Sequence, residues 1–189
     1  MRWLLRKLLL LLLVPAFAYI VFVWWLGIES SRASVCRGSA NAGRLEGGGR
    51  IAYAGDNFRA YSLLGYLIGR TFVHSAVRDS MRDAYAEVYR EHPDLRFVYA
   101  ETSWPWGGPF PPHKTHANGT AVDFHVPVRT TDGAVTDLPT HAFNRFGYDM
   151  EFDNSGRSGS YQIDFEAMAL HIIALDKAAK AHGARIQHI

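Results

Sequence analysis

The chain has 189 residues, of which 48% are hydrophobic and 20% are charged, and its formal net charge at pH 7 is +2. This length and balance are typical of one globular domain with a short appendage. No basic stripe runs along the sequence, so nucleic-acid binding is excluded as a function class. The single cysteine, Cys36, excludes an internal disulfide framework and a cysteine-rich metal site.

The N-terminus begins with basic residues and continues as an uninterrupted apolar run from Leu8 to Ile28. At about 1.5 Å per helical residue, this run is long enough to cross a bilayer core of about 30 Å. Trp24 and Trp25 lie near its far end, where interfacial aromatic residues gather. We therefore predict that residues 1–29 form a transmembrane anchor with the rest of the chain outside, and a cleaved signal peptide is the alternative.

Residues 30–49 are small, polar and rich in glycine, which predicts a linker. A single domain is expected over residues 50–189. Apolar residues recur at helical spacing from Ser75 to Glu91 and predict a helix that buries Met81 and Tyr85.

A short strand is expected from Arg96 to Glu101, and the acids Glu101, Asp132 and Asp137 are expected to face solvent. Residues 146–160 are acidic, aromatic and rich in glycine. They have two interpretations that the sequence leaves open, a surface loop or a flap beside a site.

A second helix is expected near the C-terminus, with His171 off its apolar stripe and a strand beginning at Ala184. These elements together predict an α+β fold in which helices flank a small antiparallel sheet, preceded by one N-terminal transmembrane helix. The expected apolar stripe consists of Phe165, Met168, Ile172, Leu175 and Ala179.

The segment from Trp104 to Val126 concentrates the candidate metal ligands. A turn signal at Gly119 is followed by residues that alternate as in a strand, so Asp123 should point back towards His116. His113, His116 and Asp123 can all coordinate a metal, and imidazole with carboxylate but no thiolate suits zinc. A structural zinc site, or a domain without metal, is equally compatible with this pattern.

The stretch GGPFPPHKTHANGTAVDF, residues 107–124, resembles the metal-binding segment of the penicillin-insensitive murein endopeptidases, relatives of lysostaphin-type and D-Ala-D-Ala zinc peptidases. The resemblance implies that His116 and Asp123 bind zinc and that His113 matches a further family histidine. Ala121 stands where the family usually has a second acid. The family also has a C-terminal His-x-His that supplies a third ligand and a catalytic histidine. No such pattern follows Asp123, so we expect a chain truncated at its C-terminus.

The activity implied by the resemblance is hydrolysis of the D-alanyl–diaminopimelate cross-link of peptidoglycan in the periplasm, by a protein anchored in the inner membrane. Zinc would polarise the carbonyl and activate a water molecule. His113 is then expected to handle the substrate or a proton. The chain contains neither His-Glu-x-x-His nor Ser-x-x-Lys, which excludes the thermolysin and acyl-serine plans.

The alternative function is that of a non-catalytic, membrane-tethered protein that binds the cell wall and keeps a remnant metal loop. The third protein ligand separates the two functions, because an open catalytic zinc site uses three protein side chains. Within this chain, His188 is the candidate for that role.

Overall fold

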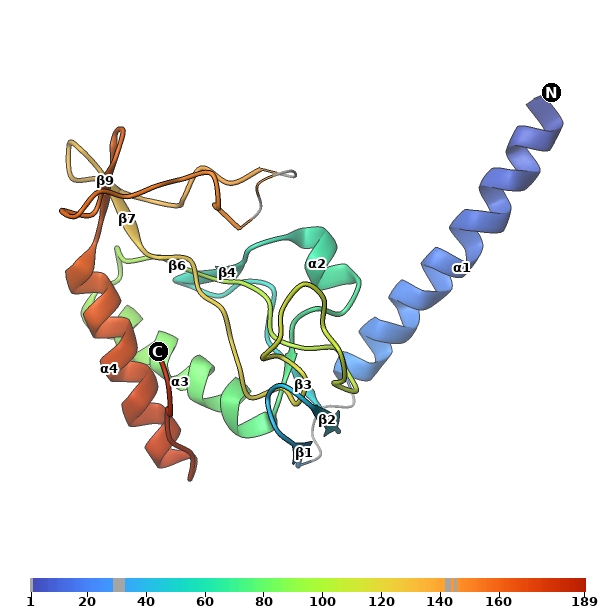
Figure 1. The fold of residues 1–189 in the computed structure, drawn as a ribbon, viewed down its shortest axis with the longest axis horizontal. Coiled ribbons are helices and arrows are strands. Elements are labelled where there is room, and N and C mark those ends of the chain that lie inside the picture. The colour runs from blue at the N-terminus through green and yellow to red at the C-terminus, as the bar shows by residue number, and fades with distance from the viewer. Residues whose placement is uncertain (1, 29–32, 142–143, 145) are drawn as a thin grey trace.

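The structure is a computed structural model that describes residues 2–28, 33–141, 144 and 146–189. It is a mixed α+β chain in which a long N-terminal helix projects away from the rest (Figure 1). Two further long helices, α3 and α4, pack side by side. The helices are α1 (Arg2–Ile28), α2 (Leu63–Leu67), α3 (Ser75–Glu91) and α4 (Phe165–Ala181).

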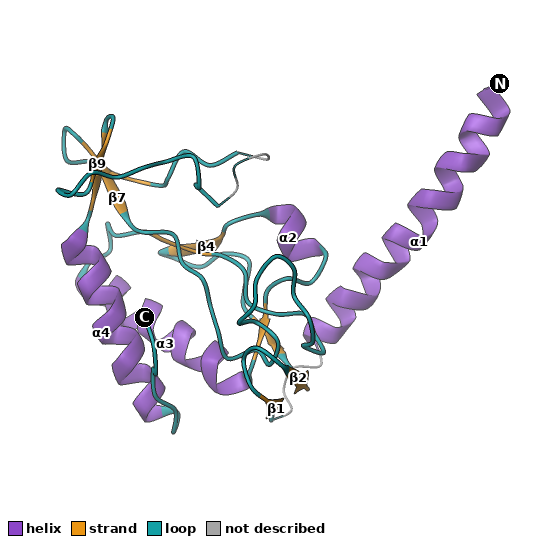
Figure 2. Ribbon diagram, in the orientation of Figure 1, coloured by secondary structure: helices purple, strands orange, loops and turns teal. Residues whose placement is uncertain are grey.

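The strands of the described residues are short and form four small sheets (Figure 2). Three sheets are antiparallel, and the largest has the strand order β8-β7-β10-β9, whereas β4 and β6 pair in parallel. The expected α+β class with antiparallel strands is confirmed, although the strands are divided among several sheets. The strands are β1 (Val35–Gly38), β2 (Gly43–Glu46), β3 (Gly49–Arg50), β4 (Phe58–Ala60), β5 (Phe72–Val73), β6 (Phe97–Tyr99), β7 (Val128–Thr130), β8 (Val135–Thr136), β9 (Arg157–Ser158) and β10 (Tyr161–Ile163).

Helix α1 contains the apolar run of the N-terminus. Its segment Leu5–Ile28 is long and apolar enough to cross a membrane or to act as a signal sequence. The two tryptophans near its C-terminal end, Trp24 and Trp25, are exposed. Residues 29–32, where the linker was expected to begin, lie outside the described part of the chain.

The remainder of the expected linker forms a β-hairpin. Strands β1 and β2 pair antiparallel, and Leu45 of β2 is buried beside Phe72. The glycines that suggested a flexible segment serve close backbone packing here. A Cβ at Gly43 would lie 2.4 Å from the carbonyl oxygen of Ser39, so only glycine fits. Residues 35–46 are therefore part of the folded domain.

The main core lies between α3, α4 and the β4–β6 pair. Met81 and Tyr85 of α3 are buried in it, as the helical periodicity predicted. The Tyr85 ring stacks on Phe58 of β4, with ring centroids 4.4 Å apart. His74 caps the helix by accepting a hydrogen bond from the backbone N–H of Ala76.

The buried face of α4 matches the expected stripe only in part, because Ala179 is buried and Leu175 packs against the core but the other buried positions differ. Phe165, the first residue of that stripe, is more than half exposed, and small side chains occupy the interface. Alanines allow the backbones of α3 and α4 to approach closely, a property that hydrophobic periodicity does not detect. Residues 184–189, expected to begin a strand, have no regular secondary structure. The buried residues of α4 are Ala167, His171, Ala174, Ala178 and Ala179.

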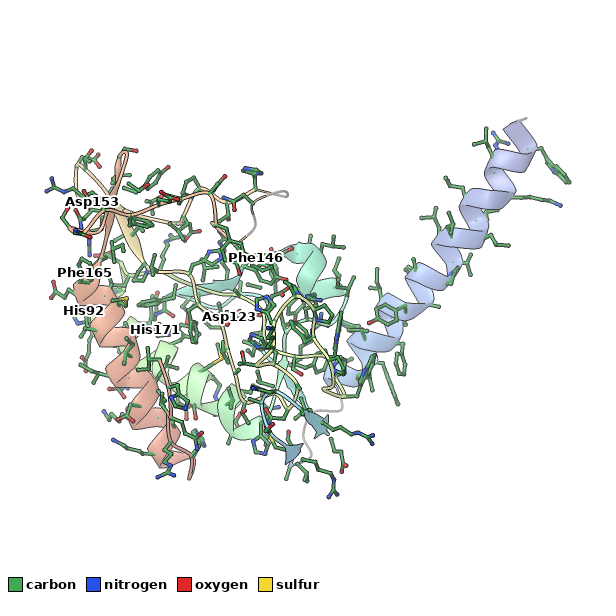
Figure 3. All side chains as sticks on the ribbon, in the orientation of Figure 1. His92, Asp123, Phe146, Asp153, Phe165 and His171 are labelled. Atoms are coloured by element: carbon green, nitrogen blue, oxygen red, sulfur yellow. The ribbon has the colours of Figure 1, made fainter. Side chains whose placement is uncertain are left out.

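His171 is also placed differently from the expectation, because it lies inside the core. Its ring stacks on Tyr85 and packs against Phe97 and Phe124 (Figure 3). Burial away from water disfavours the charged imidazolium and lowers the pKa of His171 from 6.5 to about 4.

This burial predicts a loss of stability in mild acid. Because the pKa of His171 is lowered in the folded state, only the unfolded chain takes up this proton as the pH falls from 6.5 towards 4. The free energy of unfolding should therefore drop over that interval, by up to about 3 kcal/mol at its lower end. Urea unfolding of the parent and of His171→Leu across this pH range measures the effect.

The leucine variant should lose most of this pH dependence, whereas His188→Gln, which changes an exposed histidine, should keep it. Equal pH dependence in the parent and in His171→Leu would contradict the assignment.

Candidate metal centre

The loop that carries the candidate ligands is held by backbone hydrogen bonds to the β1–β2 hairpin. The N–H of Leu45 donates to the carbonyl of Trp106 over 3.0 Å, and the N–H of Ala117 donates to Ala40 over 2.8 Å. Gly107 has φ +71°, and a Cβ there would lie 2.4 Å from the carbonyl oxygen of Ala117. The glycine is therefore required for the loop to close against the hairpin.

The second half of the segment from Trp104 to Val126 runs beside β6. The N–H of Asp123 donates to the carbonyl of Glu101 over 3.0 Å, and Ala100 donates to the carbonyl of Asp123 over 2.7 Å. Val122 and Phe124 pack against the core. The segment pairs with β6 only through an isolated bridge at Phe124, so it is extended without being a regular strand.

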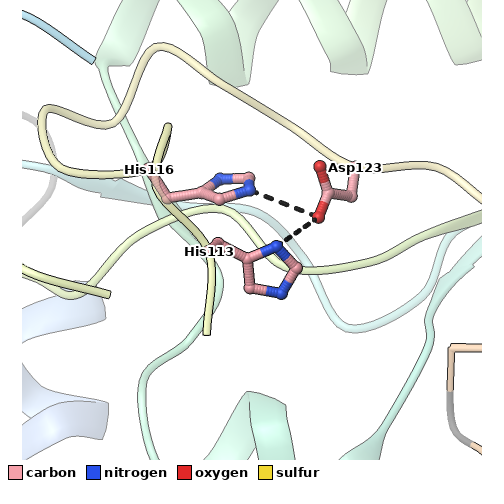
Figure 4. A group of neighbouring side chains, drawn as sticks. All are labelled: His113, His116 and Asp123. Carbon is pink, nitrogen blue, oxygen red and sulfur yellow. Dashed lines mark ion pairs between the residues drawn. The ribbon is translucent and has the colours of Figure 1, made fainter. Parts of the chain in front are cut away.

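The turn and the extended segment bring three side chains together (Figure 4). The Nδ1 atom of His113 lies 3.3 Å from Oδ2 of Asp123, and Nε2 of His116 lies 3.2 Å from the same oxygen. One ligand atom from each of the three residues lies within 4.8 Å of the others. The side chain of His116 is 1% exposed, whereas that of Asp123 is 42% exposed. The cluster is thus enclosed at the histidines and open at the carboxylate.

These residues fit a zinc ion. Ligands about 2.0–2.1 Å from a tetrahedral zinc lie roughly 3.3 Å from each other, close to the separations of Asp123 Oδ2 from the two histidine nitrogens. Among the described residues, Nδ1 of buried His116 has no hydrogen-bond partner, and its Nε2 faces Oδ2 of Asp123 at 3.2 Å. A ring nitrogen and a carboxylate oxygen that face each other in this way can hold a metal ion together, so coordination at Nε2 fits the geometry.

Glu101 lies directly behind the cluster, contrary to the expectation that it faces solvent. Its side chain is fully buried, and its Oε2 lies 2.9 Å from Nε2 of His113. Tyr61 donates its hydroxyl proton to Oε1 over 2.5 Å, and Arg70 donates to both carboxylate oxygens. The carboxylate therefore faces one nitrogen of His113 while the other nitrogen faces Asp123.

The arrangement around His113 is that of a histidine ligand supported by a carboxylate. A proton on Nε2 facing Glu101 leaves the lone pair on Nδ1 for a metal, and such partners commonly fix the tautomer of metal ligands. His113 was expected in a substrate or proton-handling role. That role stays a prediction, and its position also allows it to complete a three-residue ligand set with His116 and Asp123.

Phe146 brings the start of residues 146–160 to the same place. Its ring lies edge-on to His113 with centroids 5.8 Å apart, and it stacks on Tyr61 at 5.5 Å. Figure 3 shows Phe146 in the region of Asp123. The first residue of segment 146–160 therefore lies beside the candidate site, as the flap interpretation requires.

Sequence reasoning missed Tyr61 and Arg70, and it misjudged Glu101. Tyr61 and Arg70 precede Glu101 by 40 and 31 positions and belong to no local motif with it. The available signal was the acid at the end of an apolar strand, since Phe97–Tyr99 is buried throughout and leads directly towards Glu101. A carboxylate that follows a fully buried strand has a raised chance of lying inside the domain.

His188 does not join the cluster. It lines a surface hollow of about 480 Å³ together with Ile172, Ile173 and Asp176 of α4. The ligand group of the described residues contains only His113, His116 and Asp123. No protein-family model matches the chain, and no curated protein matches it either.

Proposed function

We propose that this chain is a zinc-dependent endopeptidase that hydrolyses D-alanyl–diaminopimelate cross-links of peptidoglycan. The observation that supports metal-dependent chemistry is the convergence of His113, His116 and Asp123 on one point. The substrate rests on the resemblance of residues 107–124 to murein endopeptidases. The periplasmic, membrane-anchored location rests on the apolar segment Leu5–Ile28.

Each residue of the cluster has a distinct task in this proposal. Zinc bound here would supply a Lewis acid and an acidified water molecule at an open fourth position. Asp123 borders that position, because its carboxylate is the exposed member of the group. His116 anchors the ion from the enclosed side. His113 acts as a ligand rather than as a proton carrier, since its two nitrogens face Glu101 and Asp123.

Digestion of purified cross-linked muropeptides by the zinc-loaded full chain tests the proposal. We expect release of monomers that a chelator blocks and penicillin does not affect. Asp123→Asn should abolish cleavage, because the amide is a much poorer zinc ligand than the carboxylate. Asp132→Asn changes an exposed aspartate in the β7–β8 turn and should retain cleavage.

Two other outcomes would redirect the assignment. Zinc binding and muropeptide binding without cleavage would favour the non-catalytic wall-binding function. Cleavage that penicillin blocks would indicate a serine enzyme and contradict the metal mechanism.

A further inference from the structure

The C-terminal part of α1 is packed against the domain. The hydroxyl of Tyr19 donates a hydrogen bond to the carbonyl of Ile68 over 3.0 Å. Val23 is fully buried and forms a small core with Leu45 and Phe72. At Gly69, where φ is +89°, a Cβ would lie 3.0 Å from Cγ1 of Val23, so the glycine leaves room for the helix. The domain thus presents a surface shaped to α1, which indicates that α1 stays with the domain.

This packing sets the level of the domain relative to a bilayer. Exposed Trp24 and Trp25 mark the interface at the C-terminal end of α1. The apolar run from Leu8 to Ile28 is about 30 Å long as a helix, which matches the hydrocarbon core. Tyr19 lies about 8 Å deeper than Trp24 along the helix axis. The carbonyl of Ile68, bonded to Tyr19, therefore lies at or below the level of the interface.

Helix α2 is the element next to this contact, and it is suited to lipid. The segment from Ser62 to Gly69, SLLGYLIG, contains no charged residue. Leu63 and Leu64 are 55% and 60% exposed, and the side chain of Ser62 accepts a hydrogen bond from the N–H of Gly65. Figure 1 shows α2 on the side of the domain that faces α1. Burying a leucine side chain away from water is worth up to about 1.5–3 kcal/mol of free energy, and each of these two leucines would lose this gain if it stayed in water.

We propose that α2 inserts Leu63 and Leu64 among the acyl chains of the same bilayer that α1 crosses. Helix α2 contacts α1, and both leucines are exposed, so one apolar environment can cover both elements. The domain is then held at the membrane by two contacts, an anchor and a short interfacial helix. The metal cluster keeps a fixed height above the bilayer, whether or not it is catalytic.

Collision measurements on a spin label test the proposal in the full chain reconstituted into vesicles of phosphatidylethanolamine and phosphatidylglycerol. Cys36→Ser provides the background, because a serine hydroxyl can keep the bond that the thiol makes to the carbonyl of Asn118. A nitroxide is attached at Leu64→Cys. Two exposed side chains provide reference labels. A label at Leu11→Cys in α1 reports the lipid environment, and a label at Ile173→Cys in α4 reports water.

Oxygen concentrates in hydrocarbon and a nickel chelate stays in water. We expect the ratio of oxygen to nickel collisions at Leu64 to approach that at Leu11 and to exceed that at Ile173 several-fold. A ratio at Leu64 equal to that at Ile173 would overturn the proposal, as would a membrane-extracted chain whose mass shows that α1 has been removed. Leu63→Cys repeats the measurement if the Leu64 label disturbs folding.

Discussion

Replacing His116 by alanine should abolish tight zinc binding by this chain. In the proposed zinc site the imidazole would supply one of three protein ligands, and it is the one enclosed by protein, at 1% exposure. The remaining pair, His113 and Asp123, would hold the ion from one side only. Loss of a residue that merely supports a ligand already costs about 10–100-fold in affinity, so loss of a ligand should cost more.

Competition titration with a chromogenic chelator measures this effect, and elemental analysis checks the metal content. His188→Ala is the matched control, because His188 is the other histidine considered as a ligand and lies beside α4. That variant should bind zinc like the parent. Loss of zinc binding in His188→Ala, or full retention in His116→Ala, would contradict the ligand set.

The choice of metal follows from the same side chains. Two imidazoles and one carboxylate favour zinc over magnesium or calcium, which prefer oxygen ligands alone. Zinc should therefore raise the unfolding temperature of the parent, because the ion binds the folded state. The increase should disappear in His116→Ala. Circular dichroism without metal tells whether that variant is folded.

The candidate ligands that the sequence brought together are those placed by local geometry. A turn at Gly119 followed by alternating residues suffices to turn Asp123 towards His116, and the structure has them 3.2 Å apart. The helix Ser75–Glu91 was predictable for a similar reason, because its apolar periodicity matches the helical repeat.

Other features depend on contacts that no local pattern encodes. Glycine-rich composition is the same in a flexible linker and in a tight hairpin, so β1 and β2 were missed. The buried face of α4 is lined by alanines, which give little hydrophobic signal. Glu101 is buried because Tyr61 and Arg70 reach it from other elements, and such partners emerge only in the folded chain.

Replacing Glu101 by alanine should cause the largest loss of stability among the site residues. The variant leaves the guanidinium of Arg70 buried without its carboxylate, since the Arg70 side chain is only 9% exposed. Removing one partner of a buried ion pair typically costs about 3–5 kcal/mol. Urea unfolding measures this loss. Glu46→Ala breaks the surface pair of Arg37 and Glu46, whose side chains are both more than half exposed, and should unfold like the parent.

The same substitution should also weaken zinc binding, because His113 loses the carboxylate that faces its Nε2 atom. The double variant Arg70→Leu/Glu101→Leu separates the two effects. Replacing both members of a buried pair by apolar side chains is often neutral for stability, so the double variant should recover much of the lost free energy. It still lacks the carboxylate, so its zinc affinity should stay about 10–100-fold below the parent. Recovery of stability and zinc affinity together would mean that Glu101 acts only by neutralising Arg70 and does not position His113.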